Sequence, residues 1–414
     1  MSAENNVPAI RFKGFSGGWE EKKLETIFNK IRNAFVGTAT PYYVKSGNFY
    51  LESNNVKNGK INRNTEVFIN DEFYQKQSDK WLRTGDIVMV QSGHVGHTAV
   101  IPPELNNIAA HALIMFTDTK EEINPHFLNF QFQTIKSKNR LSEITTGNTI
   151  KHILSSEMKE FYASFPHFKE QNIVGNYFQQ LDTLSTQHQK KHDKLLNLKK
   201  ALLEKIFPKQ GATVPEIRFK GFSGEWEEME FKELAEVRRG LTYKPSDIEK
   251  DGVKVLRSSN INVDRFVLRE DDVHVNKNAI NIKLIEKGDI LITSANGSSH
   301  LVGKHAVVSD LDKETVHGGF MLVASTQRPF FLNASMSTVW YERFLSMHVA
   351  GGNGAIGNLK ASTLEKQNIL IPKDEEQAKI GNLFKHLDKL ITQHQAQLNK
   401  LNNIKQACLE KMFV

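Results

Sequence analysis

The feature that most constrains this chain is an internal duplication. Residues 10–21 read IRFKGFSGGWEE and residues 217–228 read IRFKGFSGEWEE, so 11 of 12 positions agree at a separation of 207. A second block, residues 170–189, returns as residues 376–395 with 12 of 20 positions identical. Blocks that recur at a nearly constant separation indicate repeated structural units. The chain of 414 residues is therefore predicted to fold as two halves of nearly equal length.

Between the repeated blocks the halves diverge, but short landmarks keep their order. The Gly-Asp pairs at residues 85–86 and 288–289 each precede a β-branched strand, a polar loop and a second strand. A helix is expected to begin with Asn124 as its N-cap and to end by Gly147, and another is expected over residues 337–347. Each variable region is therefore predicted to be a compact α+β domain.

A heptad pattern follows each variable region, because apolar residues recur there at alternating spacings of three and four. The pattern predicts two helices of about 35 residues each. Such narrow apolar stripes need partners, so we expect the helices to pack antiparallel as a coiled coil, with the two α+β domains in a pseudo-twofold arrangement. Polar residues at the seam, such as His188 and His394, can fix register. The predicted seam residues are Leu181, Leu184, His188, Leu195, Leu198, Leu387, Leu390, His394, Leu401 and Ile404.

Composition narrows the class of protein. A single cysteine, Cys408, excludes an intramolecular disulfide and a cysteine-rich metal site. No apolar run approaches the roughly 20 residues of a membrane span, so no membrane association and a cytoplasmic location are expected. Six of the seven excess positive charges lie in residues 169–210 and 373–414. This charge fits either ordinary solubility or an anionic partner such as nucleic acid.

Motifs for catalysis, nucleotide binding or metal binding are missing or out of context. Gly352, Gly354 and Gly357 match a dinucleotide fingerprint, but a helical pattern precedes them where a strand is required. His188 and His192 have metal-ligand spacing without a third ligand. The sequence has no nucleophile elbow, Walker A loop or Asn-Pro-Pro-aromatic motif. A binding protein without catalytic residues, cofactor or metal is therefore favoured over a fused enzyme.

Polar loops after the Gly-Asp strands are the strongest functional candidates. Residues 91–94 and 293–300 carry short amide, hydroxyl and imidazole groups, which read base edges and phosphates. A second polar loop follows in each half, near residues 146–151 and 353–360. A solvated loop without function is the alternative at any single position. The predicted DNA-binding residues are Gln91, Ser92, His94, His97, Asn148, Lys151, Ser294, Asn296, Ser298, His300, Lys304, Asn353 and Lys360.

Taken together, these motifs resemble the specificity (S) subunit of type I DNA restriction-modification systems. The resemblance rests on the repeated entry FKGFSG-x-WE, on the domain exits PHFKEQ at residues 166–171 and PKDEEQ at residues 372–377, and on the length of each half. The first exit has Phe165 before its proline, where isoleucine is typical of the family. The resemblance implies two target-recognition domains, residues 1–168 and 211–372, and two spacer helices, residues 169–210 and 373–414.

The resemblance also implies a function and partners. It implies a non-catalytic subunit that reads an asymmetric, bipartite target in double-stranded DNA, one half-site per domain. The implied partners are two methyltransferase subunits and two restriction/translocase subunits, which would hold the S-adenosylmethionine, ATP and Mg²⁺. The alternative is a coiled-coil adaptor that binds only protein, and it predicts no sequence preference in DNA.

Overall fold

The computed structural model describes residues 6–147, 151–349 and 357–414. Asn148, Asn353 and two glycines of the fingerprint-like motif, Gly352 and Gly354, lie outside the described residues. The chain forms two compact units, each described here by itself. The first unit comprises Met1–Gln189 with Ala396–Val414, and the second comprises Lys190–Gln395.

The first unit is built on a four-stranded antiparallel sheet. Both faces of its strand β8 are buried, because Ile87 and Met89 enter one apolar cluster while Val88 and Val90 enter another. Burial on both faces explains why this strand appears in the sequence as a continuous apolar run. The strand order is β2-β11-β8-β9, formed by Phe28–Asn33, Leu113–Thr119, Ile87–Val90 and Thr98–Val100.

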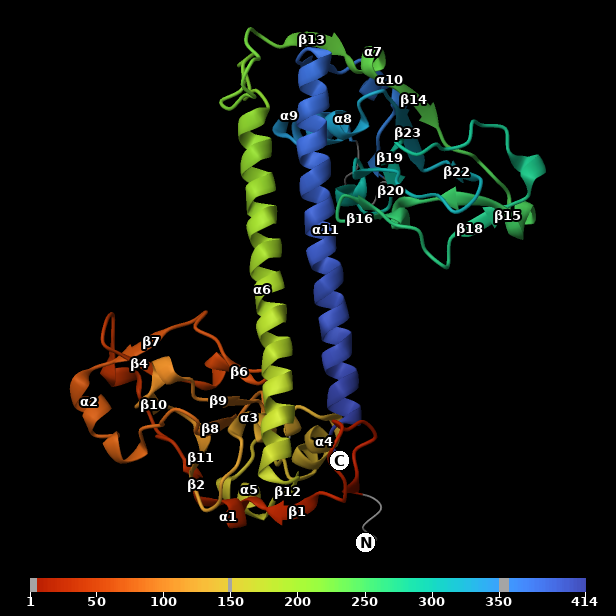
Figure 1. Ribbon diagram of the computed structural model, residues 1–414. Helices are drawn as coiled ribbons and strands as arrows, with labels where there is room; N and C mark the ends of the chain where they lie inside the picture. The colour runs from red at the N-terminus through yellow and green to blue at the C-terminus, as the bar shows by residue number, and fades with distance from the viewer. Residues whose placement is uncertain (1–5, 148–150, 350–356) are drawn as a thin grey trace. The chain divides into compact units, whose positions relative to one another are not determined.

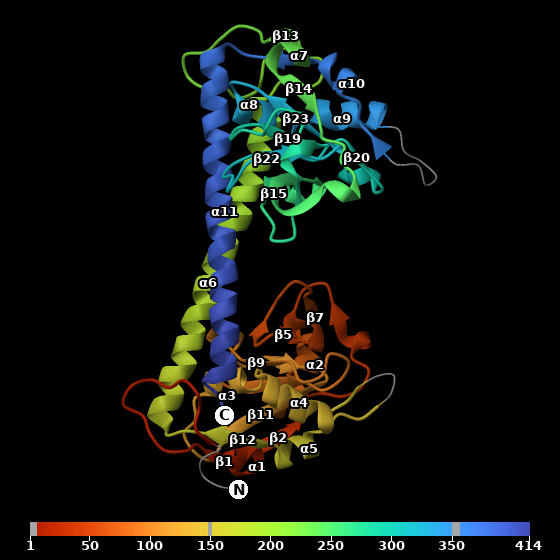
Figure 2. The ribbon, with the colours of Figure 1, turned by 90° about the vertical axis from the view of Figure 1, so that its right-hand side faces the viewer.

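The second unit repeats this sheet (Figure 2). Ile290 and Ile292 face one apolar cluster and Leu291 faces the other, as in the first unit. Two α+β domains are therefore present, as predicted from the duplicated landmarks. The strand order is β14-β23-β19-β21, formed by Glu236–Arg239, Met321–Ser325, Ile290–Thr293 and His305–Val307.

A smaller sheet extends each unit beyond the main sheet. In the first unit its order is β10-β4-β7-β3, formed by Ala109–Ala110, Asn48–Leu51, Val67–Ile69 and Tyr43–Val44. In the second unit its order is β18-β15-β22, formed by Val273–Val275, Ile248–Leu256 and Thr315–His317.

Strand pairs join the start and end of each domain. The first domain pairs β1 with β12, and the second pairs β13 with β25. These strands directly follow the repeated entry and directly precede the long helices. Their bounds are Glu20–Lys23, Tyr162–Phe165, Glu227–Glu230 and Asn368–Ile371.

The helix predicted from Asn124 begins as expected but is interrupted. Helix α3 spans Pro125–Gln131, and the Asn124 side chain accepts a hydrogen bond of 3.0 Å from the Phe127 amide. The predicted continuation to Gly147 is wrong. The Thr134 hydroxyl caps a new helix, α4 (Ile135–Glu143), by accepting from the Ser137 amide. Threonine favours the N-cap position, so Thr134 is the residue in the sequence that marks this break, and the prediction did not use it.

The second unit has the same two helices. Helix α9 spans Val339–His348, close to the predicted residues 337–347. It is preceded by α8 (Pro329–Ser335), which the sequence analysis missed. Pro329 at the first helical position is a start signal, but Arg328 before it is not a residue type that favours the N-cap position.

The two long helices are present and pack antiparallel within each unit (Figure 1). Helix α6 spans Phe168–Ile206 and helix α11 spans Asp374–Lys411. In the first unit Lys405 Nζ lies 2.8 Å from Asp182 Oδ1, and Tyr177 lies beside Cys408. In the second unit Lys199 Nζ lies 2.6 Å from Asp388 Oδ1. The predicted antiparallel pairing is therefore confirmed in each unit.

The seam of these helices corrects part of the prediction. Leu181 and Leu387 are buried as predicted, whereas Leu184 and Leu198 are each 44% exposed. On α6 Ser185 and Lys199, each one residue after a predicted leucine, are partly buried instead. On α11 the same shift replaces Leu390 by the buried Ile391, while Leu195, Leu401 and Ile404 pack against the cores and His188 and His394 are half-buried.

The repeated blocks of the sequence bind each other inside each unit. Arg11 forms a bidentate ion pair with Glu170, with Nε and Nη2 each 2.7 Å from a carboxylate oxygen. Arg218 forms the same pair with Glu376 at 2.8 Å. Both glutamates are 1% exposed, so the ion pairs are buried on the carboxylate side. The duplication thus preserves a contact between the domain entry and the start of a long helix.

A glycine in each repeated helix lets that helix approach the domain closely. A Cβ at Gly175 would lie 2.7 Å from Asn124 Oδ1, and a Cβ at Gly381 would lie 2.9 Å from the Phe331 amide. Contacts this short leave no space for a side chain. The two glycines therefore seat α6 and α11 against the start of α3 and of α8, respectively.

Each core is completed by a phenylalanine that lies just after the end of a long helix. In the first unit Phe413 packs between Phe127 and Phe178, with ring centroids 5.2 and 5.6 Å away. In the second unit Phe207 takes this place beside Phe331 and Phe384. The residues at the end of α11 therefore belong to the core of the first unit.

Candidate nucleic-acid interface

The two polar loops predicted in the first unit are hydrogen-bonded to each other. The first loop closes a hairpin after β8, in which the Val90 amide donates to the His97 carbonyl at 2.8 Å. The second loop pairs with it, since the Gly93 amide donates to the Lys151 carbonyl at 3.1 Å and the Ile153 amide to the Gln91 carbonyl at 2.9 Å. The structure thus brings Gln91, Ser92 and Lys151 together.

The second unit repeats this arrangement with different residues. The Thr293 amide donates to the Lys304 carbonyl at 2.8 Å, which closes the hairpin. Strand β20 (Ala295–Asn296) pairs with β24 (Gly357–Asn358), and the Leu359 amide donates to the Ser294 carbonyl at 2.7 Å. The same backbone frame therefore presents two different sets of side chains.

The predicted contact residues differ in accessibility. His94, Lys151, Ser298, His300 and Lys360 are exposed, so they can reach a ligand without rearrangement. Ser294 is buried, and Gln91, Ser92, His97, Asn296 and Lys304 are half-buried.

Asn296 holds its own loop together. Its Nδ2 donates to Ser258 Oγ at 3.3 Å, and its Oδ1 accepts from the Ser298 amide at 2.9 Å. Both ends of the amide therefore bind protein groups. Asn296 positions the loop by these contacts, and a direct contact to a base would have to share or replace them.

His97 is held in its neutral form by its surroundings. Burial lowers its pKa below the ordinary value, and the neighbouring His94, Lys138 and Lys57 lower it further. Its Nδ1 lies 3.4 Å from the Asn58 amide, which suits an unprotonated nitrogen at that position. A neutral imidazole can both donate and accept a hydrogen bond, as base reading requires.

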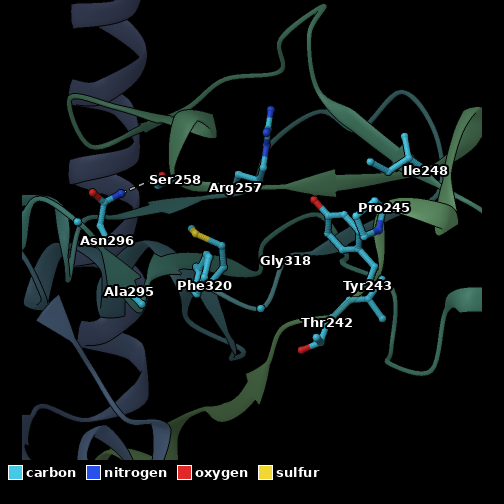
Figure 3. Close-up of a pocket in the computed structure, with 14 residues that line it drawn as sticks. Thr242, Tyr243, Pro245, Ile248, Arg257, Ser258, Ala295, Asn296, Gly318 and Phe320 are labelled. Carbon is cyan, nitrogen blue, oxygen red and sulfur yellow. Dashed lines mark hydrogen bonds between the residues drawn. The ribbon is translucent and has the colours of Figure 1, made fainter. Parts of the chain in front are cut away.

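A cleft of 580 Å³ in the second unit adds residues that the sequence analysis did not single out (Figure 3). Residues far apart in the chain converge on it, so no local motif marks it. The glycine pair before Phe320 gives a hint, because it marks a loop, and binding residues occur disproportionately on loops. Its lining includes Tyr243, Arg257, Ser258, Asn296 and Phe320.

The first unit has a charged cluster at the corresponding place in its fold. Tyr43 donates to Glu52 Oε1 at 2.5 Å, and His111 Nδ1 lies 3.6 Å from the same oxygen. The His111 contact lowers the pKa of Glu52, and Glu52 raises the pKa of His111. Burial, together with Glu52, raises the pKa of Tyr43 to about 12.

This cluster predicts a pH-dependent contribution to stability. Because the folded-state pKa of His111 is raised, its contribution is fully present below the ordinary value of 6.5 and is lost as pH rises through the folded-state pKa. Because the pKa of Glu52 is lowered, its contribution is full above 4.5 and is lost on acidification through the folded-state pKa. The contact between His111 and Glu52 therefore contributes fully to stability between pH 4.5 and pH 6.5.

His111→Gln is accordingly expected to cost on the order of 1 kcal/mol in that window and less at higher pH. Denaturant unfolding of both proteins from about pH 5 to about pH 9 measures the difference. A difference that stays constant over this range would contradict the assignment.

The described residues contain no group of three or more His, Cys, Asp or Glu side chains placed to hold a metal ion. In this part of the chain, no helix has the length and apolar character needed to cross a bilayer.

Comparison with known proteins places the chain in one family. The family described as a type I restriction modification DNA specificity domain matches residues 16–221 and, a second time, residues 223–403. The two matches follow the two halves of the duplicated sequence. The chain therefore belongs to the family of type I restriction-modification DNA specificity proteins, and it is a DNA-recognition subunit.

Individual relatives agree with this assignment. The chain is 23% identical to the specificity subunit of the type I restriction enzyme EcoKI from Escherichia coli (strain K12), over 96% of this chain and 88% of the relative. It is 21% identical to the StySPI specificity subunit from Salmonella potsdam, with the same coverage. The crystal structure of an S subunit from M. genitalium shares the fold, with a TM-score of 0.68 at 14% identity, covering 99% of both chains.

Proposed function

We propose that each unit reads one half-site of an asymmetric, bipartite target in double-stranded DNA. The observation that carries this proposal is the pair of hydrogen-bonded polar loops, which recurs on the same sheet in both units with different side chains. Because the loops of both units share a backbone arrangement but carry different side chains, they support recognition of two different sequences. The predicted DNA-binding residues of both loops remain the proposed contacts.

In this proposal residues 1–168 and 211–372 are the recognition domains, and residues 169–210 and 373–414 are the spacer. The spacer sets the gap between the half-sites. Half-sites roughly 34–36 Å apart would lie on one face of the duplex, since that distance is one helical turn of DNA. The excess positive charge of the spacer suits methyltransferase surfaces or nearby phosphates.

The chemistry is proposed to belong to partner subunits. Two methyltransferase subunits would use S-adenosylmethionine, and two restriction/translocase subunits would use ATP and Mg²⁺. Support comes from the relatives, which are specificity subunits of restriction enzymes. The chain itself is proposed to be non-catalytic, and its single cysteine suits the reducing cytoplasm.

The direct test is to express the chain with its methyltransferase subunit and to map methylated adenines across a genome. We expect one bipartite motif with two different halves separated by a fixed gap. Methylation without sequence preference, or none that depends on this chain, would refute the proposal and favour a protein-binding adaptor.

Two loop variants are expected to affect this complex differently. Asn296→Ala should relax base preference in the second half-site by about 1–3 kcal/mol, the size of one lost base contact, because the loop loses the hydrogen bonds that position its side chains. Lys151→Ala should weaken binding to all sequences alike. It should also reduce the slope of log K against log salt concentration by about 1, the effect of one lost phosphate contact. Methylation mapping and binding at several salt concentrations measure both effects, with Lys76→Ala as an exposed control. If Asn296→Ala leaves the methylated sequence and its rate unchanged, the loop assignment is wrong.

A further inference from the structure

The cleft of the second unit contains an aromatic ring that is unusually exposed for its size. Phe320 is 70% exposed, although it follows two glycines in a segment leading directly into β23. In Figure 3 Phe320 lies between Asn296 on one side and Tyr243 on the other. An exposed ring inside a cleft offers apolar surface, and covering it with a ligand is favourable.

The backbone that carries this ring is fixed. The Phe320 carbonyl accepts hydrogen bonds from the Ser294 amide at 2.9 Å and from the Ala295 amide at 3.1 Å. The backbone of Phe320 is thus anchored to the first polar loop, the one proposed to read DNA. Because these hydrogen bonds hold the two segments together, a ligand that contacts the loop also lies close to the residue that carries the ring.

The cleft walls suit a small apolar group at the edge of a polar ligand. Tyr243 and Ile248 add apolar surface, while Arg257, Ser258 and Asn296 provide polar and positively charged groups at the rim. Among the base pairs of DNA, thymine presents this combination in the major groove, where its 5-methyl group lies beside the O4 acceptor.

The first unit lacks this feature at the corresponding place. The His111 amide binds the Leu51 carbonyl, just as the Gly318 amide binds the Leu256 carbonyl in the second unit. The strand that follows starts with Leu113 in the first unit and with Met321 in the second, and both are completely buried. The second unit has one more residue before this strand, and that turn carries Phe320. The residue after Leu51 is Glu52, whereas the residue after Leu256 is Arg257. The ring is therefore a property of the second domain and not of the shared scaffold.

We propose that the cleft of the second unit reads a thymine of its half-site, with Phe320 packed against the 5-methyl group. This inference rests on the proposed function, because it requires that the second domain reads a half-site. Phe320 would be a specificity-determining residue in addition to those of the polar loops.

The test uses the complex of this chain with its methyltransferase and duplexes carrying the mapped target. Each thymine of the second half-site is replaced in turn by uracil, which removes only the methyl group. We expect one replacement to weaken binding about fourfold, the effect of one buried methyl-sized group. The Phe320→Ala complex should bind thymine and uracil duplexes equally at that position.

Controls separate this inference from the proposed function. Val339→Ala, at a position 57% exposed and outside the cleft, should keep the sensitivity of the natural chain to uracil. The inference is overturned if no thymine of the second half-site is sensitive, if Phe320→Ala keeps the sensitivity, or if it weakens binding regardless of the methyl group. The proposed function stands in each case, as long as the natural complex still selects a bipartite sequence.

Discussion

Replacing Phe413 by alanine is expected to destabilise the first unit by about 3–5 kcal/mol, the usual cost of removing a buried phenylalanine ring. Phe413 is 7% exposed and lies within 6.0 Å, between ring centroids, of Trp19 as well as of Phe127 and Phe178. Removing it leaves a cavity among rings that cannot collapse easily. The second unit should be affected much less, because Phe207 takes the corresponding place there.

Hydrogen exchange followed by mass spectrometry can measure this difference, since it reports the protection of each unit separately. Phe207→Ala is the matched variant and should produce the opposite pattern, with loss of protection in residues 190–395. Leu184→Ala, at a position 44% exposed, should change stability by no more than about 0.5 kcal/mol. If Phe413→Ala lowers protection in both units equally, or in neither, the end of α11 does not hold the first core.

Removing Arg11 is expected to have an effect of similar size, by a different mechanism. Arg11→Ala leaves the carboxylate of Glu170, only 1% exposed, without its charged partner. An uncompensated buried charge typically costs about 3–5 kcal/mol. The loss should appear as a lower free energy of unfolding of the first unit, measured by denaturant titration.

The corresponding double variant distinguishes pairing from simple loss of a side chain. Arg11→Ala combined with Glu170→Ala should be less destabilised than the sum of the single variants, with a coupling of about 0.5–3 kcal/mol. Lys76→Ala breaks an exposed pair with Glu72 and should leave the free energy of unfolding nearly unchanged. Strict additivity of the first two substitutions would show that the ion pair does not act as a unit.

Much of the architecture could be predicted from the duplication. Repeated blocks, together with heptad spacing, correctly predicted two α+β domains and antiparallel helices. The phase of the seam could not be predicted reliably, because leucines occur on both sides of it. Leu184 and Leu198 favour one phase, but Val174 and Phe178, which pack against the domain, fix the other. Contacts with the domain therefore determine which side of α6 forms the seam, and helix periodicity alone does not.

The candidate site, like the fold, could be predicted from the sequence only in part. The first polar loop of each half could be found because it follows a Gly-Asp strand in the sequence. That the two loops of each unit are hydrogen-bonded depends on how the sheet places them, which no local pattern specifies. The cleft depends even more on tertiary structure, because Tyr243, Arg257 and Phe320 come from three separate segments.

The placement of Phe413 in the first core also has a consequence for the order of folding during synthesis. The second unit is continuous in sequence, so it can complete its core as soon as residue 395 has been made. The first unit must wait for residues that are translated after the entire second unit. At about 5–20 residues per second, the 206 residues from 190 to 395 take roughly 10–40 s to translate. During this interval the first domain exposes the apolar surface that α11 later covers, so the half translated first is the last to become fully native.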